Sequence, residues 1–192
     1  MQVRLAVLCL AALTGFGGVA RARPILNETW TASALADVVL EQAQTMSDAG
    51  VDGDDATLVD FMYPRVVAAM GGRVAAIHSL RKDRVELEGK NYGLNAVRVV
   101  SATVPVQAGT ELHSIVTSFQ YMFGPDAVFR AKTYMIASSN DGGEHWKFVS
   151  VPQHNPEAIK AVFPVWNASL KIPKPPEPER VSTDFVIDGA AK

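Results

Sequence analysis

Two places in the chain combine residue types that could do chemistry. Residues 138–146 read SSNDGGEHW and contain the pattern Ser139-x-Asp141-x-Gly143-x-x-Trp146. The second place is His113, in a stretch where aromatic residues alternate with other residues. Histidine is a common general base in enzymes and also a common ligand-binding donor. Each place has a functional and a purely structural interpretation.

The first pattern resembles the Asp-box of sialidases and related β-propellers. In those proteins several copies lie at the hairpins of the blades, away from the active site. This chain holds one copy in 192 residues, which is far too short for a propeller. We therefore expect a hairpin turn and no sugar-cleaving site. In this turn Asp141 accepts hydrogen bonds from turn amides, the glycines take positive φ, and Trp146 packs below.

The alternation around His113 predicts one face of a strand. That face would carry His113, Phe119 and Tyr121, and in a helix-covered sheet it would line a cavity together with Tyr63. His113 is then a candidate general base or ligand donor. The alternative, which we favour, is a histidine near the sheet edge with one satisfied hydrogen bond. Arg84 lies on an apolar helical stripe and could bind an anionic ligand, although a stem that covers the core edge is the commoner role.

The remaining histidines have no recognisable metal-ligand spacing, so we expect no metal and no cofactor. The acidic stretch 52–55 superficially resembles a calcium loop. It lacks the downstream glutamate that an EF-hand needs, because Tyr63 occupies that position. We expect turn chemistry there.

The first 22 residues have the pattern of a secretory signal peptide. Arg4 precedes an apolar run that is too short to span a membrane comfortably, and the sequence ARA at 20–22 suits signal peptidase. We expect cleavage after Ala22 and export to the periplasm or the cell exterior. The single cysteine, Cys9, would leave with the leader, so the exported chain would have no disulfide or thiolate site.

Charge and hydropathy limit the partners. The leader carries Arg4 and Arg21 out of 18 basic residues and none of the 20 acidic ones, so the rest of the chain has a net charge of −4. A nucleic-acid binder would usually show a basic face, and we expect none. After the leader no apolar run approaches the length of a membrane helix.

Periodicity predicts helices first and strands afterwards. Helical spacing covers 31–46, with a cap at Thr31 or Ser33, and then 54–70, which Pro64 should split. Gly71 and Gly72 should end that region, and a third helix should run over 73–89. The period then changes to two, which predicts a meander of four antiparallel strands within 94–151. We expect one α+β domain over 23–165 and an extended, poorly packed, Pro-rich charged tail over 166–192.

The order of these elements, the Tyr63-Pro64 and Gly71-Gly72 helix break, and the final hairpin from Ser139 to Phe148 carry a resemblance. They are similar to uncharacterised exported bacterial members of the nuclear-transport-factor-two-like (ketosteroid-isomerase-like) superfamily. The resemblance covers roughly residues 31–165. It implies a conical, cystatin-like fold in which helices pack on a curved four-stranded antiparallel sheet. Related folds often dimerise through the sheet, so a homodimer is permitted here.

Three functions follow, in order of preference. The first is a non-catalytic module that binds a small hydrophobic ligand or a protein partner, because no acid–base or nucleophile set converges in the sequence. The second is a small-molecule enzyme of the ketosteroid-isomerase or dehydratase type, with His113 or a carboxylate as base in an apolar pocket. The third is a secretion-linked accessory protein that acts through the Pro-rich tail.

Overall fold

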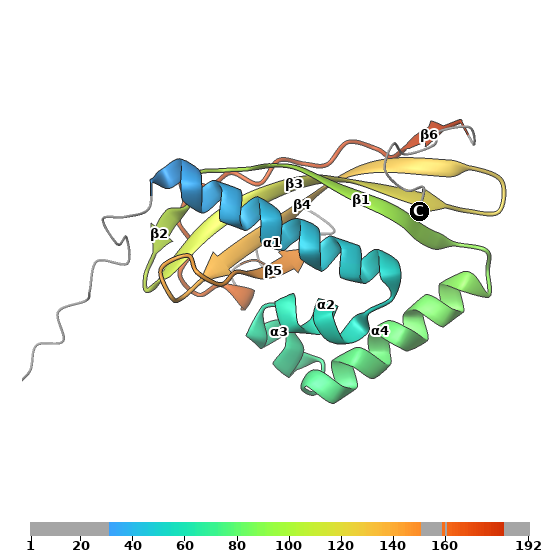
Figure 1. The fold of residues 1–192 in the computed structure, drawn as a ribbon, viewed down its shortest axis with the longest axis horizontal. Coiled ribbons are helices and arrows are strands. Elements are labelled where there is room, and N and C mark those ends of the chain that lie inside the picture. The colour runs from blue at the N-terminus through green and yellow to red at the C-terminus, as the bar shows by residue number, and fades with distance from the viewer. Residues whose placement is uncertain (1–30, 151–158, 160, 183–192) are drawn as a thin grey trace, which may run out of the picture.

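The structure is a computed structural model that describes residues 31–150, 159 and 161–182. It is an α+β fold in which N-terminal helices precede an antiparallel sheet of six strands that does not close (Figure 1). The expected leader, residues 1–22, lies outside the described residues. Among the described residues, no helix is long and apolar enough to cross a lipid bilayer.

Helix α1, Ala32–Asp52, begins where the sequence predicts. The Thr31 side chain accepts a hydrogen bond from the amide of Ala34, which satisfies one free donor of the first turn. The helix ends six residues later than expected, at Asp52, and Gly53 caps it. That glycine takes φ 73° and its amide bonds to the carbonyl of Ala49. The acidic stretch 52–55 therefore joins two helices, because Asp54 caps the helix that begins at Asp55.

Pro64 splits the next helical region as predicted. Helix α2 spans Asp55–Phe61 and α3 spans Pro64–Ala69, with the proline at the first helical position. Gly71 and Gly72 both have positive φ and separate α3 from α4, Arg73–Glu88. Of α4 only Ala76 is buried, so the stripe expected along this helix is not a core-facing stripe.

The sheet contains two more strands than the four expected. Its path is β1 (Gly93–Ala102), β3 (Glu111–Phe123), β4 (Val128–Ser139) and β5 (Lys147–Ser150). The expected first strand is divided, and its second part, β2 (Val106–Ala108), pairs separately with β3. Pro105 lies at this division and has no N–H to give to a ladder. Strand β6, Glu179–Val181, comes from the Pro-rich segment and pairs with β4.

The two faces of the sheet are covered differently. Helix α1 lies along one face, where Leu35, Val39 and Met46 pack against Leu112 and Val116 in one core cluster (Figure 1). On the opposite face, Ile115 and Ile136 pack against Phe163, Leu170 and Ile172 in a second cluster.

In the described part of the expected tail, residues 166–182, two side chains pack more closely than the composition predicts. Leu170 is 7% exposed and Ile172 is 9% exposed. Composition alone could not reveal this, because apolar partners such as Ile115 and Ile136 lie on strands far earlier in the chain.

Candidate functional site

A single carboxylate organises a polar cluster at one end of the sheet. Glu111 accepts a hydrogen bond from the hydroxyl of Ser138 (2.7 Å) and from the hydroxyl of Tyr63 (3.0 Å to Oε1, 3.3 Å to Oε2). Nε2 of His113 lies 2.9 Å from Oε2. We call Tyr63, Glu111, His113 and Ser138 the Glu111 cluster.

The fold assembles this cluster from three elements. Glu111 and His113 are two residues apart at the start of β3, so their side chains share a face, and Ser138 lies opposite His113 on β4. Tyr63 arrives from the break before α3. Its backbone amide bonds to the carbonyl of Phe148 on β5 (3.0 Å), which fixes the break against the sheet.

His113 is enclosed. It is 1% exposed, and its ring lies 5.0 Å from the ring of Phe163 and 5.5 Å from that of Trp166, centroid to centroid. Its Nδ1 atom is buried without a hydrogen-bond partner in the part of the chain that the structure describes. The contact to Glu111 is the one hydrogen bond that the sequence predicts for this side chain. His113 lies on the face of the sheet opposite α1.

The electrostatics of the cluster favour an ionised carboxylate and a neutral phenol. Burial by itself would raise the pKa of Glu111, but hydrogen bonds from His113, Ser138 and Tyr63 outweigh it and hold that pKa below its ordinary value. Burial, with the hydrogen bond to Glu111 and its negative charge, raises the pKa of Tyr63 to about 12. Neither group is adjusted to exchange protons near neutral pH, as an efficient general acid or base would be.

Two cavities flank the cluster and share Tyr63, Arg65 and Glu111 in their walls. One, of about 280 Å³, extends towards Asn140, His145 and Lys147. The other, of about 210 Å³, extends towards Phe163, Pro164 and Val165. The Glu111 side chain is 27% exposed, so the carboxylate is within reach of a ligand.

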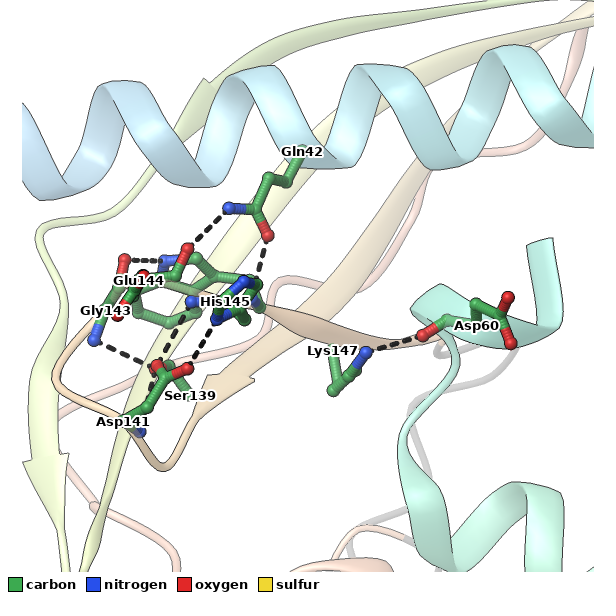
Figure 2. Close-up of polar contacts among 9 residues, drawn as sticks. Gln42, Asp60, Ser139, Asp141, Gly143, Glu144, His145 and Lys147 are labelled. Atoms are coloured by element: carbon green, nitrogen blue, oxygen red, sulfur yellow. Dashed lines mark hydrogen bonds and ion pairs between the residues drawn. The ribbon is translucent and has the colours of Figure 1, made fainter. Parts of the chain in front are cut away.

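The hairpin at 139–146 is held by its own hydrogen bonds (Figure 2). The amide of His145 donates to Asp141 (3.1 Å), the amide of Gly143 donates to the Ser139 hydroxyl (2.9 Å), and that hydroxyl donates to Asp141 (2.7 Å). Gly143 has φ 98°, and the indole of Trp146, fully buried, donates to its carbonyl (2.9 Å). Every group of the pattern thus has a role in the turn.

The same hairpin contains one group of residues that could be considered for a metal. Asp141, Glu144 and His145 are exposed and bring ligand atoms within 4.8 Å of one another. Nδ1 of His145 already lies 2.8 Å from Asp141, and both Asp141 oxygens are hydrogen-bonded within the turn. Burial would raise the pKa of Asp141, but hydrogen bonds from His145 and Ser139 lower it. Nothing beyond proximity points to an ion.

Another, largely apolar pocket lies between the C-terminal half of α4 and the start of β1. Its volume is about 280 Å³. Its apolar side chains are Val51, Leu58, Leu80, Leu87, Tyr92, Leu94 and Phe123. Three of these remain well exposed: Leu87 at 49%, Tyr92 at 45% and Phe123 at 41%. Large apolar side chains that stay exposed around one opening are typical of a binding surface.

Arg84 lies in the wall of this apolar pocket with its charge engaged. Its guanidinium donates two hydrogen bonds to Asp55, at 2.8 and 3.0 Å, and Asp55 has a side chain only 3% exposed. A Cβ atom on Gly53 would lie 2.6 Å from the Arg84 guanidinium, so only glycine fits beside this pair. The anion that Arg84 binds is thus within the protein.

The five residues singled out from the sequence do not form one pocket. Tyr63 and His113 meet through Glu111, while Phe119 and Tyr121 lie farther along β3, where Arg130 lies over the Phe119 ring at 5.1 Å. Phe119 and Tyr121 share the sheet face of His113, opposite α1 and its helical cover. The expected cavity between the helices and this aromatic face is absent from the described structure.

Sequence reasoning missed Glu111 and Asp55 as organising residues. The spacing Glu111-x-His113 within an alternating stretch was the available signal for the first, because it puts a carboxylate and an imidazole on one face. Asp55 stands in an acidic stretch that reads as turn chemistry, and nothing local connects it to Arg84.

Comparisons with protein-family models, with curated proteins and with solved structures find no match.

Proposed function

We propose that this chain is a non-catalytic binding module that holds a small, largely apolar molecule in the pocket between α4 and the start of β1. The observation that carries the proposal is the exposure of Leu87, Tyr92 and Phe123 around one opening. Leaving such side chains in water costs free energy that a bound apolar molecule would recover. A protein partner inserting one apolar side chain is the alternative occupant.

The chemistry of the site supports binding over catalysis. Asp55 and Arg84 in the pocket wall are paired with each other, and the other charged residues of the lining are two acids, Asp83 and Glu88. Among the described residues, no histidine, serine or cysteine lines this pocket beside them. His113, one of the bases considered for an isomerase of the ketosteroid type, is 1% exposed and packs against Phe163 and Trp166.

The proposal is tested with the neutral fluorescent probe N-phenyl-1-naphthylamine. We expect saturable fluorescence enhancement with the wild-type chain and a large loss of affinity in Leu87→Asp. The matched control is Val74→Asp, on the same helix, 81% exposed and outside the pocket. Equal affinity in both variants, or no binding by the wild type, contradicts the proposal. Native mass spectrometry of the chain purified from its exporting host then identifies the natural adduct.

We also propose that the chain is an exported member of the conical α+β class. The signal-peptide pattern of residues 1–22 supports export, and the order of helices before an antiparallel sheet supports the class. N-terminal sequencing of the exported protein should begin at Arg23. A mature chain that retains Met1 would contradict the export proposal.

A further inference from the structure

The basic group nearest to the Glu111 carboxylate is the His113 imidazole, whose Nε2 lies 2.9 Å from Oε2. Among the described residues, no lysine or arginine lies within ion-pair distance of Glu111. The three groups that contact it are two hydroxyls and an imidazole. Its depressed pKa keeps the carboxylate ionised at neutral pH. Oε1 receives only the Tyr63 hydroxyl within hydrogen-bond distance and has room for another donor.

A cation without a partner lines the same two cavities. Arg65 is exposed and makes no hydrogen bond or ion pair within the described ranges, although it lies close enough to Tyr63 to lower that hydroxyl's pKa in opposition to burial and Glu111. Arg65 and Glu111 are too far apart to pair directly. A guanidinium with no partner among the described residues and an ionised carboxylate thus line the same two cavities, together with Tyr63.

This pairing of charges selects one kind of ligand. A simple anion would be drawn by Arg65 and repelled by Glu111, whereas a simple amine would experience the reverse. A molecule with both an ammonium and a carboxylate satisfies both groups. The ammonium would donate to Oε1 of Glu111, and the carboxylate would accept from Arg65 in the two-point geometry that guanidinium groups favour.

The smaller cavity indicates what else the ligand carries. Beyond the shared wall, it is bordered by Ala108, Thr110, Phe163, Pro164 and Val165, and Val165 is 56% exposed. The exposed part of Val165 offers an aliphatic side chain an apolar contact beside the Thr110 hydroxyl. We propose that Tyr63, Arg65 and Glu111 form a second binding site, separate from the α4 pocket, which takes a free α-amino acid with an aliphatic side chain.

The test uses three probes that share one carbon skeleton. L-leucine carries both charges, isoamylamine only the ammonium and 4-methylpentanoate only the carboxylate. Isothermal titration with the full chain should show leucine binding, with the other two weaker by about tenfold or more, because each forfeits one charge-assisted contact.

Variants then assign the binding to the site. Arg65→Ala should weaken leucine binding by about tenfold or more, and Glu111→Gln by a similar factor. Lys82→Ala, which removes an exposed cation on α4, should leave it unchanged. Arg65 is on the surface, so its variant stays informative even if Glu111→Gln fails to fold.

Three results would overturn the proposal: leucine binding unchanged by Arg65→Ala, either single-charge probe binding as tightly as leucine, or no heat at about 10 mM leucine, where even a 1 mM site would be occupied. None of these three results would contradict the function proposed for the apolar pocket, because that proposal is tested with a different probe and different variants.

Discussion

The side-chain amide of Gln44, on α1, donates a hydrogen bond to the backbone carbonyl of Val97 at 2.9 Å, on the outer edge of β1. The same amide accepts from the backbone N–H of Val99, also at 2.9 Å. Gln44 thereby pairs with backbone groups of β1 on the side where no other described strand pairs with it. Exposed strand edges invite pairing with other chains, and this contact closes the centre of β1.

We therefore expect Gln44→Ala to destabilise the fold and to expose the edge. Losing two hydrogen bonds to partly buried backbone groups should lower the free energy of unfolding by about 1–3 kcal/mol. Urea unfolding measures the loss, and size-exclusion chromatography should show more self-association. Thr45→Ala, which removes a hydroxyl bonded to its own helix, is the control. An unchanged unfolding midpoint in Gln44→Ala would contradict the role assigned to the amide.

Gln42, also on α1, binds two backbone groups of the hairpin through its side-chain amide, as Gln44 binds two of β1. The Gln42 amide donates to the carbonyl of Glu144 (2.8 Å; Figure 2). The same amide accepts from the N–H of Trp146 (2.8 Å). Helix α1 is thus tied to the sheet by two-point contacts at two places. Because both contacts join positions more than 50 residues apart, their presence could not be derived from helical periodicity.

The ion pair of Asp55 and Arg84 supplies a second prediction. Arg84→Ala leaves a carboxylate that is 3% exposed with only Arg81, at 3.5 Å, as a partner. Uncompensated buried charge is costly, so we expect a loss of about 3 kcal/mol in the free energy of unfolding.

Arg81→Ala is the matched control for that measurement. Arg81 is 66% exposed and its contact to Asp55 is long, so its removal should cost less than about 1 kcal/mol. If both variants lose the same stability in denaturant unfolding, the bidentate contact of Arg84 is not the stabilising one.

The depressed pKa of Glu111 makes the stability depend on acid pH. A carboxyl whose pKa is lower in the folded state contributes stability above its ordinary value of 4.5, and this contribution is lost as the pH falls through the folded pKa. Asp54, Asp60 and Asp141 also have lowered pKa values and add to the same trend.

Comparison of wild type with Glu111→Gln isolates the Glu111 contribution. The glutamine cannot titrate, so the free energy of unfolding should fall less steeply below pH 4.5 in the variant than in wild type. Chemical unfolding at several pH values from about 7 down to about 3 gives both slopes, because this range spans the usual carboxyl pKa values near about 4. Identical slopes would show that Glu111 titrates alike in the folded and unfolded chain.

How far the sequence predicts this molecule depends on how local each signal is. Thr31 as a helix cap, Pro64 as a helix start and Gly71-Gly72 as a helix end all act within a few residues, and all are found as expected. The meander of β3, β4 and β5 likewise follows from period-two alternation and short turns.

The candidate sites were less predictable, because they depend on tertiary neighbours. Tyr63 meets Glu111 across 48 positions and Arg84 meets Asp55 across 29. Alternation correctly placed His113, Phe119 and Tyr121 on one face, but it could not tell which face the helices cover. That face is covered by the C-terminal segment, whose proline-rich composition masks the few apolar residues that do the packing.

Two truncations test how much the C-terminal segment contributes. Ending the chain after Asn167 removes Leu170 and Ile172, both nearly buried against the second core cluster. Burial of an aliphatic side chain is worth about 1.5–3 kcal/mol, so roughly 3–6 kcal/mol of unfolding free energy should disappear.

Ending the chain after Pro173 keeps both side chains and removes β6, including the ion pair of Arg130 with Glu179, which is half exposed. This longer chain should lose much less stability, since exposed ion pairs contribute little. Thermal and urea unfolding of the two chains should thus differ widely. If they unfold alike, the segment from 168 to 173 is not part of the core.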